Sequence, residues 1–126
     1  MENNRNRDVS ELIKKIGYEF KNEEYLHEAL THRSYANEIE KGRRFNNEKL
    51  EFLGDAILNL ITTEYIYDLY EKKTEGELAK LKSQIISEPV FSTIASELEL
   101  GEYLYLSNGE IMSGGRHRRS ILGDAF

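Results

Sequence analysis

The sequence predicts one all-α domain, and three observations support this prediction. Apolar residues recur three and four positions apart in several segments, which is the spacing of an amphipathic helix. Residues that cap helices, such as asparagine, serine and threonine, stand just before those segments. Only residues 103–106 resemble a strand, and no second candidate exists to pair with them, so we expect an extended connection there. With 126 residues, the chain is long enough for one domain and too short for two.

The N-terminal part of the chain is predicted to hold a tail and two helices. Residues 1–8 are expected to be a flexible tail, and the domain proper spans residues 9–126. The first helix occupies residues 9–16 and ends at Gly17, because glycine commonly terminates helices. Asn22 is placed to cap the second helix. The apolar residues of these two helices are Leu12, Ile13, Ile16, Leu26, Ala29 and Leu30.

A long central helix is expected from about residue 47 to residue 70, after a charged loop at residues 38–45. Its apolar residues lie on nearly every face, so we expect the helix to be largely buried. Gly54 lies inside it, where glycine costs roughly 1 kcal/mol relative to alanine and usually marks close approach by another backbone or a ligand. The apolar residues are Leu50, Phe52, Leu53, Ala56, Ile57, Leu58, Leu60, Ile61, Tyr65, Ile66, Leu69 and Tyr70.

Each later helix has its own start signal. Thr74 is predicted to cap a helix with Glu77 as its capping-box partner, and the core stripe of that helix is Leu78, Leu81, Ile85 and Ile86. Ser87, followed by a proline in the first turn, caps the next helix, which should run until Gly101. After that we expect a turn at Asn108 and Gly109, a flexible basic loop at residues 113–116, and a last helix from about Arg119.

Three carboxylates of the central helix share one stripe. Glu48, Glu51 and Asp55 lie at positions i, i+3 and i+7, which places them on one side of a helix. A buried carboxylate is costly unless a positive group compensates its charge. That group is either a lysine or arginine of a neighbouring helix or a metal ion, and the spacing alone leaves both alternatives open.

A short repeat increases the weight of the metal alternative. The sequence Leu-Gly-Asp-Ala occurs at residues 53–56 and again at residues 122–125, each time between apolar residues. If the two segments pack glycine to glycine, Asp55 and Asp124 come together. A set of carboxylates gathered in this way is typical of a site for a hard divalent cation.

Residues 47–56, which read Asn-Glu-Lys-Leu-Glu-Phe-Leu-Gly-Asp-Ala, resemble the signature of the ribonuclease III family of double-stranded RNA endonucleases. Residues 30–35, 75–82 and 113–126 resemble further segments of that family, in the same order along the chain. The resemblance implies a compact helical endonuclease domain that cuts double-stranded RNA in ribosomal and other RNA processing. It also implies a homodimer, because in this family two sites cut the two strands.

The resemblance also implies a set of site residues. Glu51, Asp55 and Asp124 match the acids that hold the divalent metal and activate water, with Mg²⁺ as the expected ion and Mn²⁺ as the alternative. Glu48 and Glu75 match further acidic positions, as accessory acids or substrate contacts. The family's fourth acid would come directly after Phe126. We therefore expect a catalytic domain truncated within its last acidic helix, without the family's double-stranded-RNA-binding domain.

The charge of the chain bears on its partners. A net charge of −6 argues against a protein that holds nucleic acid by bulk electrostatics. A local basic cluster remains a possible RNA backbone contact, although solvated surface is the alternative for each of its members, Arg116, Arg118 and Arg119. No apolar run approaches the about 18 residues of a membrane span, and there is no cysteine, so we expect a cytoplasmic protein with no membrane partner.

Other functions were weighed against the nuclease. A ribonuclease III-like module that binds structured RNA without cutting it is the alternative, but Glu51, Asp55 and Asp124 are all present. A glycosidase would need aromatic sugar platforms, and the chain has no tryptophan. His32 is expected to be a hydrogen-bonded structural residue, because no zinc-type histidine spacing surrounds it.

Overall fold

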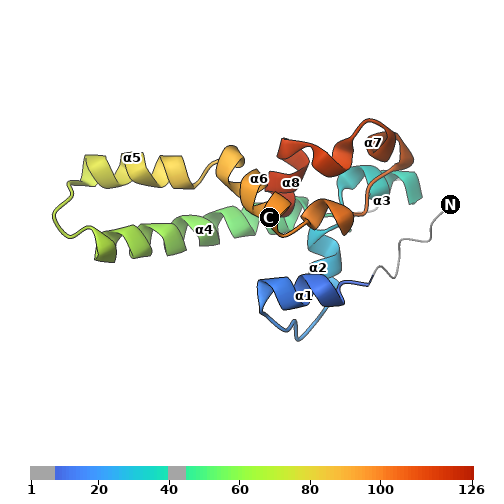
Figure 1. The fold of residues 1–126 in the computed structure, drawn as a ribbon, viewed down its shortest axis with the longest axis horizontal. Coiled ribbons are helices and arrows are strands. Elements are labelled where there is room, and N and C mark those ends of the chain that lie inside the picture. The colour runs from blue at the N-terminus through green and yellow to red at the C-terminus, as the bar shows by residue number, and fades with distance from the viewer. Residues whose placement is uncertain (1–7, 40–44) are drawn as a thin grey trace.

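The structure is a computed structural model that describes residues 8–39 and 45–126. The predicted tail lies outside the described residues except for Asp8, and most of the predicted loop at residues 38–45 lies outside them too. Over the described ranges there are eight α-helices and no strand, which confirms the all-α prediction (Figure 1). The helices are α1 (Ser10–Ile16), α2 (Glu24–Ala29), α3 (Arg33–Ile39), α4 (Glu48–Leu69), α5 (Glu75–Ile85), α6 (Glu88–Glu97), α7 (Asn108–Met112) and α8 (Arg119–Ala125). Two short 3₁₀ helices are η2 (Leu100–Glu102) and η3 (Gly115–His117).

The hydrophobic core lies in the part of the molecule that we call the body, which comprises α1 to α3, α6 to α8 and their connections. The predicted core residues Leu12, Leu26 and Leu30 are buried, which confirms the assignment of the first two helices. They pack with buried residues from the second half of the chain. These partners are Ala95, Leu100, Leu104, Tyr105, Leu106, Ile121 and Leu122.

Residues 103–106 form the predicted extended connection, and they cross the body next to the end of α2. The backbone N–H of Tyr105 donates to the Leu30 carbonyl at 2.9 Å, and the His32 N–H donates to the Tyr105 carbonyl at 3.0 Å. Thr31 and Tyr105 therefore make a single parallel bridge. Because this bridge fixes residues 30–32 on the core, the side chains that follow them have a defined position.

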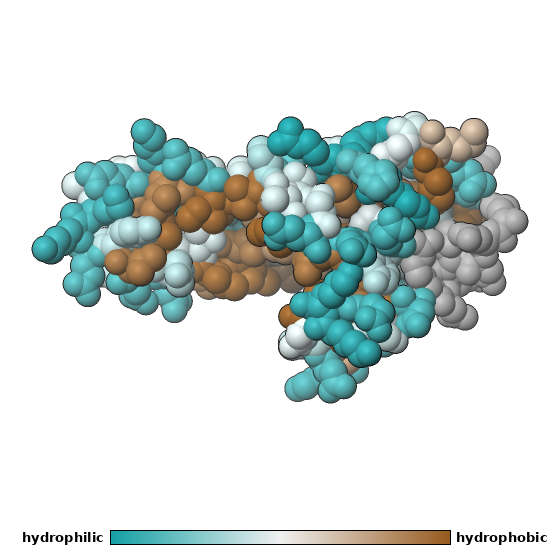
Figure 2. All heavy atoms as spheres, viewed as in Figure 1, coloured by the Kyte–Doolittle hydropathy of each residue, from teal (hydrophilic) through white to brown (hydrophobic). Residues whose placement is uncertain are grey.

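Helices α4 and α5 lie side by side as a hairpin that projects from the body (Figure 1). The prediction that α4 is largely buried is wrong, because Ile66 is its only buried side chain, while Phe52 is 84% exposed and Leu60 is 65% exposed. The physical reason is geometrical: α4 has apolar residues all round, and α5 covers only one side of it. Figure 2 shows hydrophobic residues gathered along this hairpin. The predicted core stripe of α5 is likewise only half-buried.

Most of the predicted helix boundaries are confirmed by capping contacts. Gly17 ends α1 with a left-handed φ of 73°. The N-cap of α2 is Glu23 and not the predicted Asn22, although Asn22 Oδ1 accepts from the Glu24 N–H at 3.1 Å. Thr74 Oγ1 accepts from the Glu77 N–H at 3.3 Å at the start of α5, and Ser87 caps α6 in the same way. No helix in the described part of the chain is long and apolar enough to span a membrane.

Two local predictions in the second half are wrong. Asn108 and Gly109 begin α7 instead of forming a turn, because Ser107 Oγ accepts from the Glu110 N–H at 3.2 Å and caps a helix there. Helix α6 ends at Glu97 and not at Gly101, since Glu99 takes a left-handed φ of 57°. Gly101 instead lies in η2, where the chain passes very close to the backbone of Arg116.

Candidate active site

An acidic pair joins the first turn of α4 to α8. The carboxyl groups of Glu51 and Asp124 are hydrogen-bonded to each other. Helix α4 is fixed at its start by Asn47, whose N–H donates to the Thr31 carbonyl at 2.9 Å and whose side-chain amide donates to the Ala29 carbonyl at 3.2 Å. Both contacts tie the start of α4 to the body, so the position of Glu51 is determined by the core.

Helix α8 is positioned by its packing on α6. A Cβ at Gly123 would lie 3.5 Å from the Glu88 side chain and 3.8 Å from that of Phe91, so α8 passes close to α6 there. The ring of Phe126 lies 5.5 Å from the ring of Phe91, centroid to centroid. The expected glycine-to-glycine packing is wrong, because no atom lies within 4 Å of the position that a Cβ would occupy at Gly54. The docking of α8 on α6 therefore brings Asp124 to Glu51.

The acidic pair has raised proton affinity. Burial raises the pKa of the Glu51 carboxyl, and the negative charges of Asp124, Asp55 and Glu48 raise it further. Burial also raises the pKa of Asp124, although its hydrogen bond with Glu51 acts in the opposite direction. A proton shared between the two carboxyl groups would relieve their repulsion, and a cation could take its place.

Asp55 lies one turn beyond Glu51 on α4 and is exposed. It lines an apolar cavity of about 300 Å³ together with Glu51 and Asp124. Within residues 8–39 and 45–126, however, no three acidic or histidine side chains converge closely enough to hold one ion. The structure thus pairs two of the three acids and leaves the third beside them.

A larger polar cavity of about 570 Å³, which we call the cleft, opens on the other side of the acidic pair. Its walls carry acids and bases in nearly equal number. They come from the segment after α2, the start of α4, α7, the residue before α8, and α8 itself. The lining residues are His32, Arg33, Asn47, Glu48, Glu51, Glu110, Arg118, Ser120, Ile121 and Asp124.

The two accessory acids lie in different places. Glu48 lines the cleft and faces Arg33, with 3.8 Å between a carboxylate oxygen and a guanidinium nitrogen. Glu75 is the first residue of α5, at the far end of the hairpin from Glu51. Because α4 has 22 residues, about 33 Å of helix separates the two ends. The structure does not bring Glu75 to the cleft.

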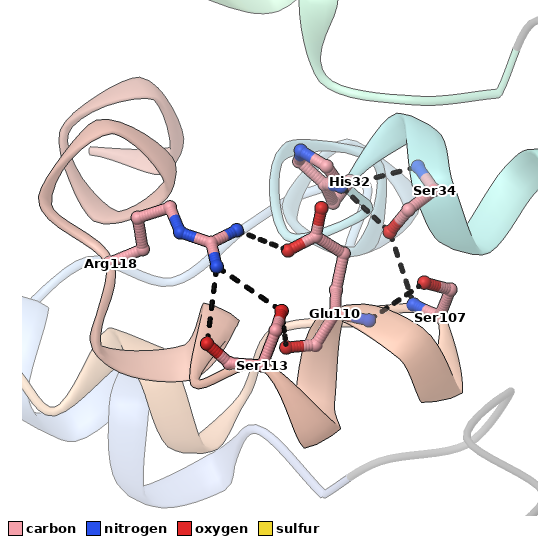
Figure 3. Close-up of polar contacts among 6 residues, drawn as sticks. All are labelled: His32, Ser34, Ser107, Glu110, Ser113 and Arg118. Carbon is pink, nitrogen blue, oxygen red and sulfur yellow. Dashed lines mark hydrogen bonds and ion pairs between the residues drawn. The ribbon is translucent and has the colours of Figure 1, made fainter.

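The three arginines predicted from the sequence as RNA contacts differ in their positions and in the contacts they make. Arg116 is half-buried, and its Nη1 donates to the Gly101 and Leu104 carbonyls at 2.9 and 2.8 Å, so its guanidinium supports the fold. Arg118 lines the cleft, where it forms an ion pair with Glu110 (Figure 3). Arg119 is exposed at the start of α8.

Sequence reasoning missed part of the cleft. Arg33 and Glu110 were not singled out, and Asn47 was seen only as the start of a motif. His32 was predicted to be hydrogen-bonded, and this is confirmed, since its Nδ1 lies 2.7 Å from Ser34 Oγ (Figure 3). The available signal was the segment at residues 30–35, which precedes the signature and supplies two of the cleft residues.

The donor set fits a hard divalent cation. Carboxylate oxygens are the ligands such ions prefer, and Mg²⁺ is commonly held by one or two carboxylates while it keeps several waters. Glu51 and Asp124 supply two carboxylates, and the raised pKa values of both groups indicate the unfavourable negative charge that a cation would compensate. Fold and site together define a helical domain built around a paired-carboxylate cleft.

Comparison with known proteins places this architecture in a family. The family model described as ribonuclease-III-like matches residues 22–126. The chain is 51% identical over 122 residues to ribonuclease 3 of Clostridium tetani and 46% identical over 124 residues to that of Borreliella afzelii. These matches cover 97% and 98% of this chain but 51% and 50% of the relatives. The chain therefore spans about half the length of the curated relatives it matches.

Solved structures agree with this assignment. A nuclease domain of ribonuclease III from Campylobacter jejuni is 40% identical and superposes with a TM-score of 0.87, covering 94% of this chain and 78% of that one. That domain is described as having structural flexibility in a region involved in dimer formation. A second structure of the same nuclease domain gives a TM-score of 0.86. The chain belongs to the ribonuclease III family and corresponds to its nuclease domain.

Proposed function

We propose that this chain is the catalytic domain of a metal-dependent endoribonuclease that hydrolyses phosphodiester bonds in double-stranded RNA, in ribosomal and other RNA processing. The observation that carries the proposal is the hydrogen-bonded pair Glu51 and Asp124 at the junction of α4 and α8, with Asp55 one turn away. Membership of the ribonuclease III family supports the reaction class.

In this proposal Glu51 and Asp124 hold Mg²⁺, or Mn²⁺ in its place. When bound, the ion makes a water molecule more acidic and stabilises the charge on the leaving oxygen. Asp55 is a further ligand or orients the attacking water. The raised pKa values of Glu51 and Asp124 mean that the empty pair binds protons more readily than free carboxyl groups do, so protons and the ion would compete for it.

The proposed substrate is recognised by its shape. A duplex of A-form RNA presents its phosphates and 2′-hydroxyls, and base edges contribute little. Arg118 at the wall of the cleft and Arg119 at its edge are placed to contact the RNA backbone, with Glu48 as an accessory acid. We leave Arg116 out of this contact set, because its guanidinium binds backbone carbonyls.

We also propose that the exposed apolar side of α4 is the interface of a homodimer. Phe52 is 84% exposed and lies next to Glu51, and the exposed apolar residues continue along the hairpin to Leu69. An apolar surface of this extent is unusual on a monomer and typical of an interface. The related Campylobacter jejuni domain has a region involved in dimer formation. Two copies would provide two sites for two strands.

The dimer is tested with Phe52→Ser. The substitution removes the most exposed apolar side chain of the proposed interface, so we expect the dissociation constant of the dimer to rise at least tenfold. Sedimentation over a range of protein concentrations measures this. Met112→Ser is the matched control, since Met112 is 88% exposed on α7, away from the hairpin. Equal dissociation constants for wild type and Phe52→Ser would refute the interface.

Cleavage is tested with labelled duplex RNA and Mg²⁺, using the 126-residue chain and a form extended by any sequence that its gene encodes after Phe126. Short products from either form support the proposal.

Two substitutions test the site itself. Asp55→Asn should abolish cleavage without unfolding the protein, and Glu51→Gln should weaken Mg²⁺ binding measured by calorimetry. Asp68→Asn, on the same helix near the far end of the hairpin, is the control. Cleavage by Asp55→Asn at the wild-type rate would refute the site, and RNA binding without cleavage by both forms would favour the binding module.

A further inference from the structure

His32 occupies a fixed position in the wall of the cleft. It directly follows the bridge between Thr31 and Tyr105, and its own N–H donates to the Tyr105 carbonyl at 3.0 Å. The side chain is half-buried and lines the cleft together with Glu51 and Asp124. The ring is therefore held by the core while one part of it meets the solvent-filled cavity.

The contacts of His32 Nδ1 determine the tautomer of the ring. The backbone N–H of Ser34 lies 3.2 Å from Nδ1, and a backbone N–H can only donate, so Nδ1 is an acceptor. The Ser107 N–H donates to Ser34 Oγ at 3.1 Å, which leaves the hydroxyl hydrogen of Ser34 to point at Nδ1 2.7 Å away. The hydrogen of a neutral His32 ring is consequently on Nε2.

The Nε2 end of the ring is a hydrogen-bond donor that no described residue accepts from. In Figure 3 this end points away from Ser34, and no contact to it is drawn. Among the residues that the structure describes, no hydrogen bond or ion pair joins Nε2. Burial lowers the pKa of His32, with Arg33 and Arg118 contributing and Glu110 and Asp124 opposing, so the ring is a neutral donor at physiological pH.

The two arginines that line the cleft each face a carboxylate. The guanidinium of Arg118 pairs with Glu110 and also donates to Ser113 Oγ at 3.2 Å. Arg33 faces Glu48 at 3.8 Å. The Nε2–H of His32 differs from the arginines, because no carboxylate among the described residues competes with a phosphate for it.

We propose, resting on the function proposed above, that His32 donates from Nε2 to a phosphate oxygen of the RNA strand in the cleft. The ring would thereby position the RNA backbone against Glu51 and Asp124. In this arrangement Ser34 and Ser107 are positioning residues, because they fix the tautomer that presents the N–H to the cleft. His32 acts as a neutral contact, unlike the arginines at the edge of the site.

The first test measures the dissociation constant of a fluorescently labelled RNA duplex in an Asp55→Asn background, which keeps the duplex intact. His32→Phe keeps a ring of similar size and removes both nitrogens, so we expect binding to weaken about tenfold, the usual effect of losing a hydrogen bond to a charged group. His32→Gln places an amide N–H near the position of Nε2 and should recover most of the affinity. His27→Phe is the matched control, because His27 is also half-buried but its ring contacts Tyr105 and Glu23.

The salt dependence of binding separates a neutral contact from an ionic one. Each ionic contact with a phosphate releases counterions, so removing one lowers the slope of log affinity against log salt by about one, whereas a neutral donor leaves the slope unchanged. We therefore expect His32→Phe to shift the plot without changing its slope. Arg119→Met should reduce the slope. A reduced slope in His32→Phe would overturn the proposed neutral contact.

The outcomes distinguish this inference from the proposed function. If the Asp55→Asn protein does not bind duplex RNA at all, the proposed function fails and the inference fails with it. If that protein binds RNA and His32→Phe binds equally well, only the inference is overturned. A measurement on the unsubstituted His32 ring guards against misfolded variants: ¹⁵N NMR should show the Nε2–H tautomer and a shift of the Nε2 resonance on addition of duplex RNA. An Nδ1–H tautomer, or no shift, would overturn the proposal.

Discussion

The hairpin and the body are built from similar sequence patterns but differ in burial. Leu104 in the body is fully buried, whereas Leu60 on α4 is 65% exposed. Both lie in apolar segments, and the segment around Leu60 is the more hydrophobic of the two. The comparison teaches that apolar periodicity predicts a helix, while burial depends on which other elements the chain can place against it.

The hairpin is exposed because it has few partners. Helix α4 contacts α5 along its length and α2 and α8 near its base. Apolar residues occur on all its faces, and a domain of this size has no further helix to cover them. In the body, α6 packs on α8, and buried residues of both helices share one core with the extended residues 103–106. A second copy of the chain is the occupant that we propose for the uncovered side.

The largest expected difference in the free energy of unfolding is between alanine substitutions of one leucine in the body and one in the hairpin. Leu104→Ala would leave a cavity in the core and should lower the free energy of unfolding by about 3–5 kcal/mol. Leu60→Ala removes a side chain that already meets solvent, so the same substitution should change the stability of the monomer by less than about 0.5 kcal/mol. Urea unfolding at protein concentrations low enough to keep the chain monomeric measures both. A large loss in monomeric Leu60→Ala would show that α4 is better covered than the structure indicates.

Helix positions were largely predictable, since caps such as Gly17, Thr74 and Ser87 act locally. Their signals depend on a few neighbouring residues, and the structure confirms them. The start of α7 was missed because Asn108 and Gly109 favour a turn, and the competing cap from Ser107 was not recognised. Burial of α4 could not be predicted, because it depends on contacts between elements far apart in the sequence.

The candidate site was predictable in part. The spacing on α4 and the repeated Leu-Gly-Asp-Ala segment pointed to Glu51 and Asp124, which the structure pairs. The reason for the pairing was not predictable, because it is the docking of α8 on α6 and not contact with Gly54. The hydrogen-bond pattern around the His32 ring was also beyond the sequence, since it depends on Ser107, which lies 73 residues after Ser34.

A second contrast compares glycine in the body with glycine in the hairpin. A Cβ at Gly101 would lie 2.2 Å from the Arg116 carbonyl oxygen, so Gly101→Ala forces the backbone apart and should cost about 3 kcal/mol. A Cβ at Gly54 would meet no atom within 4 Å, so Gly54→Ala should stabilise the monomer by up to about 1 kcal/mol through helix propensity.

Thermal unfolding of the two glycine variants at low protein concentration measures this contrast. The proposed dimer adds a further test, because a second copy that approaches α4 closely at Gly54 would clash with the added methyl group. Sedimentation of Gly54→Ala measures the dissociation constant of the proposed dimer, whereas its melting temperature measures the stability of the monomer. A destabilised Gly54→Ala monomer would contradict the open space described at that position.

The smallest expected effect is at the acidic pair, where the hairpin meets the body. The pKa values of Glu51 and Asp124 are raised above 4.5 and 3.8, so the stability that the protonated pair contributes is fully present below about pH 4 and is lost as the pH rises through the raised values. The side chain of Glu51→Gln cannot ionise, so this variant should be slightly more stable than wild type at pH 7 but not at pH 4.

His32 has the opposite effect on the pH dependence of stability. Because its pKa is lowered, the folded state loses stability as the pH falls below 6.5.

Melting temperatures from pH 4 to pH 8, with and without Mg²⁺, separate these contributions. Mg²⁺ should raise the melting temperature of wild type near neutral pH, because the ion binds the folded protein and relieves the repulsion between the two carboxylates. Glu51→Gln should respond much less. Glu97→Gln, on the exposed side of α6, is the control that should follow the wild-type profile. If Glu51→Gln were less stable than wild type at pH 7 without Mg²⁺, the acidic pair would be an ordinary structural contact. Its negative charge would then not indicate a cation site.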